Sequence, residues 1–126
     1  MRWLTIEQML RIHDAVLNAT PGARGVRDLV LLESAMLRPL TSMGGVELYP
    51  GLPTKVAVLL ESIVQYHPFV DGNKRTAVVA ACTVLELNGL RLVASQEEVE
   101  DLAVSVANHT MRLADIIPWV ARHVGA

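Results

Sequence analysis

The stretch that decides the fold is KRTAVVAACTVLELN, residues 74–88, which is apolar at most positions after its first three. Apolar side chains over most of a helix's circumference are typical of a helix that is buried on all sides. Asn88 and Gly89 follow as residue types that favour a helix C-cap. The pattern therefore predicts a buried central helix at about residues 74–88.

Helical signals continue on both sides of this segment. Thr5 and Gln8 have the spacing of a capping box, as do Ser95 and Glu98. Apolar residues at helical intervals predict further helices after Thr5 and at residues 28–38, 54–66, 95–108 and 115–124. The sequence thus predicts an all-α bundle of about six helices around the central one, folded as a single domain over residues 1–126.

Composition limits the classes of function. The chain has 126 residues, of which 52% are hydrophobic and 19% charged, unlike a disordered segment. A formal net charge of -2 argues against a broad electrostatic contact with nucleic acid. The single cysteine, Cys82, excludes an internal disulfide, and its apolar neighbours indicate an inert core thiol. No apolar run approaches the about 20 residues of a membrane span, and the N-terminus lacks a signal-peptide layout, so we expect a soluble, cytoplasmic protein.

The start of the central helix breaks a folding rule. Helix N-termini carry partial positive charge and favour acidic neighbours, yet this helix opens with Lys74 and Arg75. Two side-chain charges added to the unpaired backbone N–H groups of a first turn concentrate positive potential at one place. Because a bound phosphate would turn this repulsion into attraction, we interpret the position as an anion site.

Chemically active residues directly precede this anion site. His67 and Asp71 lie in a short segment that contains Pro68 and Gly72. A neutral imidazole accepts a proton from a hydroxyl near pH 7, and an aspartate beside phosphates suits Mg²⁺. Asn73 is a further donor to phosphate or an aid to metal positioning. The combination indicates phosphoryl or nucleotidyl transfer, although Asp71 and Asn73 are also residue types that cap helices.

The string HPFVDGNKRT, residues 67–76, resembles the signature loop of the Fic/Doc family, and specifically its Doc (death-on-curing) branch. Three other stretches agree with that branch: IHD at residues 12–14, RD at 27–28 followed by LLESA at 31–35, and LNG at 87–89. The resemblance therefore covers nearly the whole chain, and the ten-residue string is far more specific than a lone glycine pattern.

The resemblance implies a toxin that acts as a protein kinase. In Doc-type proteins ATP lies with its γ-phosphate at the histidine, and the target is a threonine of elongation factor Tu, so translation stops. The resemblance gives His67 the role of base and Asp71 that of Mg²⁺ ligand. It assigns stabilisation of the transferring phosphate to Gly72, Asn73, Lys74 and Arg75.

Two departures from the wider family favour phosphoryl transfer over AMP transfer. Family members that transfer AMP to protein hydroxyls carry a glycine where this chain has Lys74, and a second arginine where it has Val78. Without these residues the backbone wraps a β-phosphate less freely and one phosphate clamp is missing. An AMP transferase that acts on a protein hydroxyl remains the alternative enzyme. A catalytically idle binding relative is the alternative from another class.

The resemblance also implies partners. The chain lacks the family's self-inhibitory pattern, a Ser or Thr followed four residues later by Glu and then Gly or Asn. Restraint is therefore expected from another chain, a Phd-like antitoxin whose C-terminal helix covers the cleft in the family. Residues 41–53 match the family's flap, which aligns the target chain beside the site. No nucleic acid or membrane partner is expected.

The remaining histidines have weaker signals. His13 and Asp14 invite comparison with HD phosphohydrolases, but those need a further upstream histidine, and only 12 residues precede His13. Packing or support of the site loop is the favoured interpretation of His13. His109 and His123 lie near expected helix ends, and no role is assigned to them.

Overall fold

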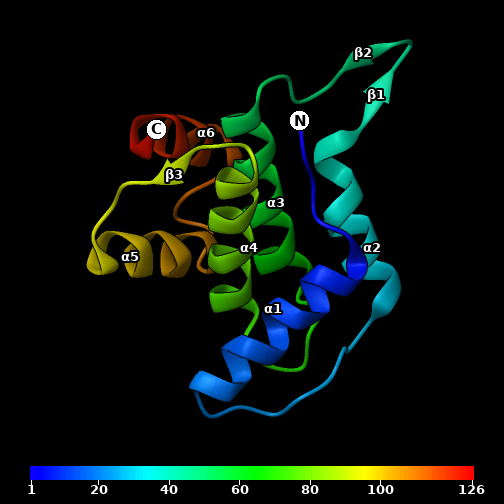
Figure 1. The fold of residues 1–126 in the computed structure, drawn as a ribbon, viewed down its shortest axis with the longest axis vertical. Helices are drawn as coiled ribbons and strands as arrows, with labels where there is room; N and C mark the ends of the chain where they lie inside the picture. The colour runs from blue at the N-terminus through cyan, green and yellow to red at the C-terminus, as the bar shows by residue number, and fades with distance from the viewer.

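The computed structural model describes residues 1–126 and consists of six α-helices with two very small sheets (Figure 1). The helices are α1 (Ile6–Ala19), α2 (Leu29–Leu37), α3 (Leu52–Tyr66), α4 (Asn73–Leu87), α5 (Gln96–Ala107) and α6 (Leu113–His123). The predicted all-α bundle is confirmed, and the predicted central helix begins at Asn73. None of these helices is long and apolar enough to cross a lipid bilayer.

The short elements join the helices. A 3₁₀ turn, η1 (Arg38–Leu40), extends α2. It leads into an antiparallel hairpin of β1 (Ser42–Met43) and β2 (Val46–Glu47). A second antiparallel pair, β3 (Arg91–Leu92) with β4 (Val124–Gly125), attaches the C-terminus to the segment after α4.

Local side-chain signals decide where several helices begin. Thr5 and Ser95 each accept a hydrogen bond from the backbone N–H three residues further on, and the side chains of Gln8 and Glu98 return the bond. Both predicted capping boxes are therefore confirmed. Asp28 caps α2 because its carboxylate accepts from the backbone N–H of Leu31.

Helices α3 and α4 lie side by side in the middle of the bundle (Figure 1). Helices α2 and α6 pack on α3, α1 packs on α4, and α5 packs on both α3 and α4. Residues 55–60 of α3 are all buried, and α4 buries Ala77, Ala80, Ala81, Val84 and Leu85 in the same core. One face of α4 stays partly open, since Val79 is 40% exposed. That face borders the cleft described below.

The predicted flap and the signature string lie at opposite ends of α3 (Figure 1). The β1–β2 hairpin precedes the first residue of α3 and His67 follows its last, 15 residues later. At about 1.5 Å per residue, α3 separates the two by about 22 Å. The hairpin therefore projects from the far end of the helix instead of lying beside His67. The turn-rich composition of residues 41–53 indicates a break between helices, but it predicts neither the hairpin nor its position.

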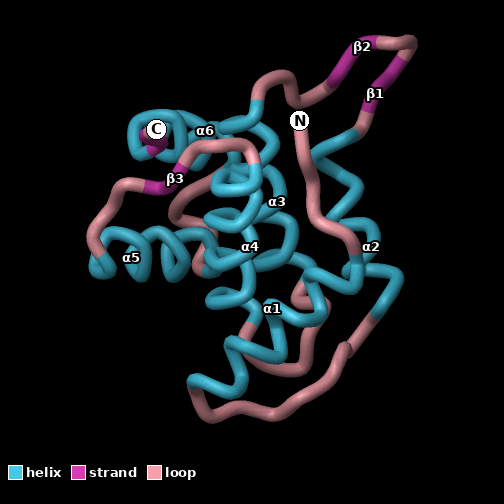
Figure 2. The backbone as a smooth tube through the Cα atoms, viewed as in Figure 1, coloured by secondary structure: helices cyan, strands magenta, loops and turns pink.

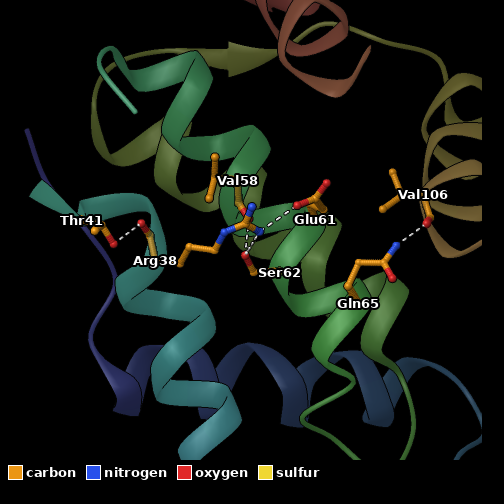
Figure 3. Close-up of polar contacts among 7 residues, drawn as sticks. All are labelled: Arg38, Thr41, Val58, Glu61, Ser62, Gln65 and Val106. Atoms are coloured by element: carbon orange, nitrogen blue, oxygen red, sulfur yellow. Dashed lines mark hydrogen bonds and ion pairs between the residues drawn. The ribbon is translucent and has the colours of Figure 1, made fainter. Parts of the chain in front are cut away.

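Polar contacts anchor the elements around α3 (Figure 3). At the base of the hairpin, Arg38 donates to Glu61 at 2.7 Å and to Ser62 at 2.9 Å. Burial by itself would lower the pKa of Arg38, but the hydrogen bonds and charges of Glu61 and Tyr49 together outweigh it and raise the pKa above its usual value. On the other side, Gln65 donates to the carbonyl of Val106 at 2.6 Å and so ties α5 to α3.

Candidate active site

The segment that joins α3 to α4, residues 67–72 and here called the motif loop, carries the predicted site. His67 ends α3 in the left-handed region, with φ 53° and ψ 54°. Pro68 and Phe69 are buried beneath the loop, whereas His67 and Asp71 are exposed. The loop thus buries Pro68 and Phe69, and leaves Val70, an imidazole and a carboxylate facing solvent.

A second segment holds the motif loop from outside. Residues 20–28, here called the connector, link α1 to α2 and run around the end of the molecule crossed by α1 (Figure 2). The two segments exchange backbone hydrogen bonds, from Val70 N–H to the Gly25 carbonyl at 3.0 Å and from Arg27 N–H to the Pro68 carbonyl at 2.7 Å. Because these bonds join backbone groups, they fix the loop without using the side chains predicted to act chemically.

Asp71 takes part in this attachment. Its Oδ2 accepts from the backbone N–H of Ala23 at 2.7 Å. It does not cap α4, because Gly72 is the N-cap residue and no side chain caps that helix. The alternative capping role of Asp71 is therefore wrong. One carboxylate oxygen bonds the connector, and no hydrogen bond engages the other.

His13 supports the motif loop from α1. It is only 3% exposed, and its ring stacks on Phe69 with centroids 3.9 Å apart and planes 8° from parallel. Its Nε2 lies 2.9 Å from the carbonyl oxygen of Asp71, a contact that requires the proton on Nε2. These contacts agree with the interpretation of His13 as a residue that supports the site loop.

Asn73 is buried, with only 5% exposure. Its Oδ1 accepts from the Phe69 N–H and its Nδ2 donates to the Phe69 carbonyl, both at 3.0 Å. The side chain thereby closes the motif loop, and the structure engages it fully in that role. Phosphate contact, metal positioning and helix capping were the three roles considered from sequence, and none of them describes these bonds.

The start of α4 has no side-chain cap. Gly72, at φ 79°, precedes it, and a Cβ there would come within 3.3 Å of Leu17. The first turn has no acidic residue and no side-chain cap, so its backbone N–H groups point outward without a protein partner. Lys74 and Arg75 are exposed, and neither forms an ion pair within the protein. Positive charge and free donors therefore coincide, as predicted for an anion site.

A cleft of about 580 Å³ extends from this anion site between α1, α4 and α5. Nine of its thirteen lining residues are hydrophobic, including Val78, Val79 and Val104, and the polar ones are Lys74, Arg75, Gln96 and Glu100. A volume of a few hundred cubic ångströms suits a small ligand or a row of side chains from a bound helix. His67 and Asp71 do not line the cleft.

Residues outside this region show no comparable arrangement. Burial raises the pKa of the Cys82 thiol, which agrees with an unreactive cysteine. His123 stacks on Trp119 and contacts Glu98 at 3.1 Å, and His109 is exposed. No group of three or more His, Cys, Asp or Glu side chains converges to hold a metal by itself.

Sequence reasoning missed two groups that hold the site. The Ala23 N–H binds Asp71, but a backbone donor has no sequence signature. The guanidinium of Arg27 binds the carbonyls of His67 and Tyr66. The only signal in the sequence that pointed to Arg27 was the Arg27-Asp28 pair, which is one of the stretches that resemble the Doc branch.

Comparisons with known proteins identify the family of the chain. A family profile described as "Fic/DOC family" matches residues 3–85. The chain is 42% identical over 107 residues to "Toxin Doc" of Mycolicibacterium smegmatis, an alignment that covers 83% of this chain and 82% of that protein. It is 28% identical over 126 residues to "Protein kinase doc" of Escherichia phage P1, covering 100% of this chain and 98% of that protein.

Proposed function

Because the chain belongs to the Fic/DOC family, we propose that it is a Doc-like toxin that phosphorylates a hydroxyl of elongation factor Tu with ATP and Mg²⁺ and so arrests translation. One observation carries the proposal: the motif loop presents His67 and Asp71 beside an uncapped, cationic helix start. An exposed imidazole next to an anion site is what transfer of a phosphoryl group to a hydroxyl needs. A target in the translation machinery places the activity in the cytoplasm.

His67 acts as the base in this mechanism. Its imidazole takes the proton from the target hydroxyl as that oxygen bonds to the γ-phosphorus of ATP. The bond from the γ-phosphorus to the oxygen that bridges it to the β-phosphate breaks, and ADP leaves with that oxygen. Lys74, Arg75 and the first-turn N–H groups of α4 stabilise charge on the transferring phosphate. Asn73 contributes through its backbone N–H, since its side chain binds Phe69.

The residues present fit a magnesium ion that is bound jointly by the protein and by substrate phosphates. Mg²⁺ is commonly bound by one or two carboxylates together with substrate phosphates, so a cage of protein ligands is not required. Asp71 supplies one exposed carboxylate, of which only Oδ2 is engaged by the protein. Bound there, Mg²⁺ would neutralise phosphate charge and hold the phosphates in line for transfer.

Phosphoryl transfer is favoured over AMP transfer by the surface of α4. Lys74 occupies the first turn, where AMP-transferring relatives of the family carry glycine. One turn later Val78 lines the cleft, so no second cation stands there to clamp a phosphate. The anion site is therefore short, and suits a single terminal phosphoryl group.

The position of the label in ATP tests the proposal. Purified protein is incubated with elongation factor Tu and ATP that is labelled either at the γ-phosphate or at the α-phosphate. Label from the γ-position on the target, absent with the variant His67→Ala, is the expected result. Label from the α-position would identify an AMP transferase instead. No label from either nucleotide, combined with harmless expression of the chain alone, would indicate an idle binding relative.

The partner that restrains the toxin is proposed to be a Phd-like antitoxin that lays a helix in the cleft between α1, α4 and α5. The apolar walls suit the apolar face of a helix. Lys74 and Arg75 suit an acidic side chain of that helix, and Glu100 suits a basic one. Helix α5 lies outside the 3–85 match but contributes residues to this cleft. The proposal therefore treats residues 1–126 as one domain. Val104→Glu adds charge at a position that is 49% exposed, so the chain should still fold. The variant is expected to abolish antitoxin binding, as measured by calorimetry. Wild-type affinity would place the antitoxin elsewhere.

A further inference from the structure

The backbone at His67 is held in a conformation that its residue type disfavours. Its φ of 53° lies in the left-handed region, which glycine adopts readily and residues with a Cβ do not. Pro68 follows and disfavours the helical alternative for His67. A side chain is nonetheless required here if an imidazole is to face the anion site. Contacts from outside the loop therefore add to the bond from the His67 N–H to the Ile63 carbonyl in stabilising this conformation.

The guanidinium of Arg27 makes the contacts that do so. Its Nε donates to the carbonyl of His67 at 2.7 Å and its Nη2 donates to the carbonyl of Tyr66 at 2.8 Å. The backbone N–H groups of Arg27 and Asp28 both donate to the next carbonyl, that of Pro68, at 2.7 and 3.0 Å. Three successive carbonyls at the end of α3 are thus bound by two residues of the connector.

The pair of guanidinium bonds fixes both backbone angles of His67. The Tyr66 carbonyl belongs to the peptide plane before His67, whose orientation sets φ. The His67 carbonyl belongs to the plane after it, whose orientation sets ψ. One rigid, planar fork that binds both oxygens therefore fixes the direction of the bond from Cα to Cβ. That direction limits the positions that the imidazole can reach through its side-chain rotamers.

We propose that Arg27 is the positioning residue for His67 in the transfer reaction, acting through the peptide planes on either side of it. The inference rests on the proposed function, because it takes His67 to be the base. Arg27 touches neither target nor nucleotide in this scheme. Lysine cannot replace it, because a single ammonium does not hold two carbonyls in the fixed geometry of the fork.

Three variants test the inference. Arg27→Gln removes the fork, and Arg27→Lys keeps the charge but not the planar donor pair. Arg24→Gln is the matched control, because Arg24 lies in the same connector but binds Asn18 and Asp14 of α1. For each, kcat and the KM for ATP are measured in the labelled-ATP assay. The NMR signal of the His67 ring Cε1–H reports ring position without any need for activity.

Both Arg27 variants are expected to lose about 100-fold in kcat, because small displacements of a catalytic group have effects of that size. Their KM for ATP should stay within about twofold of wild type, since the phosphate contacts are untouched. The His67 ring signal should shift or broaden in both. Arg24→Gln should match the wild type in kcat, KM and the His67 signal.

Two results would overturn the inference. One is a wild-type kcat and an unmoved His67 signal in Arg27→Gln. The other is a loss of activity that merely follows the unfolded fraction and disappears at temperatures where the variant is fully folded. If the wild-type protein transfers no phosphate, the proposed function fails. The ring signal then decides by itself whether Arg27 positions His67.

Discussion

Mutations of Asp71 can separate its two roles, which are the attachment of the motif loop to the connector and the proposed binding of magnesium. Its Oδ2 accepts from the Ala23 N–H at 2.7 Å, and its carboxylate is the proposed magnesium ligand. The variant Asp71→Ala removes both functions. The variant Asp71→Asn keeps an oxygen that can accept from Ala23 but loses the negative charge that a divalent cation needs.

The expected cost in stability is small. A hydrogen bond to a charged group contributes about 1.5–3 kcal/mol when it is well shielded, and exposure of Asp71 to solvent reduces this. The variant Asp71→Ala should therefore lower the free energy of unfolding by about 1 kcal/mol, a fall in Tm of about 3–5 °C for a domain of this size. Asp71→Asn should lie within about 0.5 kcal/mol of wild type, because the bond to Ala23 is kept.

The expected cost in activity is large and equal in the two variants. Neutralisation of phosphate charge by a metal contributes several kcal/mol to the transition state, and about 1.4 kcal/mol corresponds to a tenfold change in rate. Both variants should therefore transfer phosphate at least about 100-fold more slowly. Thermal unfolding followed by circular dichroism and transfer from γ-labelled ATP measure the two effects on the same samples.

Two outcomes would refute the reasoning about Asp71. Wild-type transfer by Asp71→Asn would show that the charge is not needed and that no magnesium ion depends on this carboxylate. A loss of more than about 3 kcal/mol of stability in Asp71→Ala would show that the residue mainly holds the fold. His67→Ala serves as the control, since it removes the base without touching the bond to Ala23.

Two further predictions concern stability. His13→Ala removes a stacked ring and the hydrogen bond to the Asp71 carbonyl, and should lower the free energy of unfolding, measured by denaturant titration, by about 3 kcal/mol. The control variant His109→Ala, at an exposed position, should lower it by less than about 0.5 kcal/mol. Equal losses in the two variants would contradict the supporting role of His13. The hydrogen bond from the Ser95 backbone, followed by that from His123, lowers the pKa of Glu98. The contribution of the Glu98 carboxylate to stability is therefore fully present above the usual pKa of 4.5 and is lost as the pH falls through the lowered value. The difference in Tm between wild type and Glu98→Gln should therefore be present at pH 6 and disappear in acid, and a difference that persists at pH 2.5 would exclude this linkage.

The elements that the sequence predicted are those with local causes. The capping boxes at Thr5 and Ser95 join atoms three residues apart, so a short window of sequence contains the whole interaction. The charge conflict at Lys74 and Arg75 is also local, because the helix supplies its own dipole. Helix existence and the coincidence of two cations with an uncapped helix start were predictable for the same reason.

The contacts that sequence could not predict join distant segments through backbone atoms. Every residue except proline carries the N–H that Ala23 offers to Asp71, so nothing in the string of letters marks it. The same holds for the carbonyls that Arg27 binds. The position of the β1–β2 hairpin depends on the length and direction of α3, which only the packed structure defines.

Asn73 shows why the residues of a signature string do not all act in chemistry. The string places it between Asp71 and Lys74, and both its amide atoms bind the backbone of Phe69 inside the loop. Its replacement would release two hydrogen bonds at 5% exposure and so displace His67 and Asp71 together. A loss of activity in an Asn73 variant is therefore no evidence that this side chain touches phosphate. Exposed Asp71, which holds the same loop by a single bond, allows that distinction to be made.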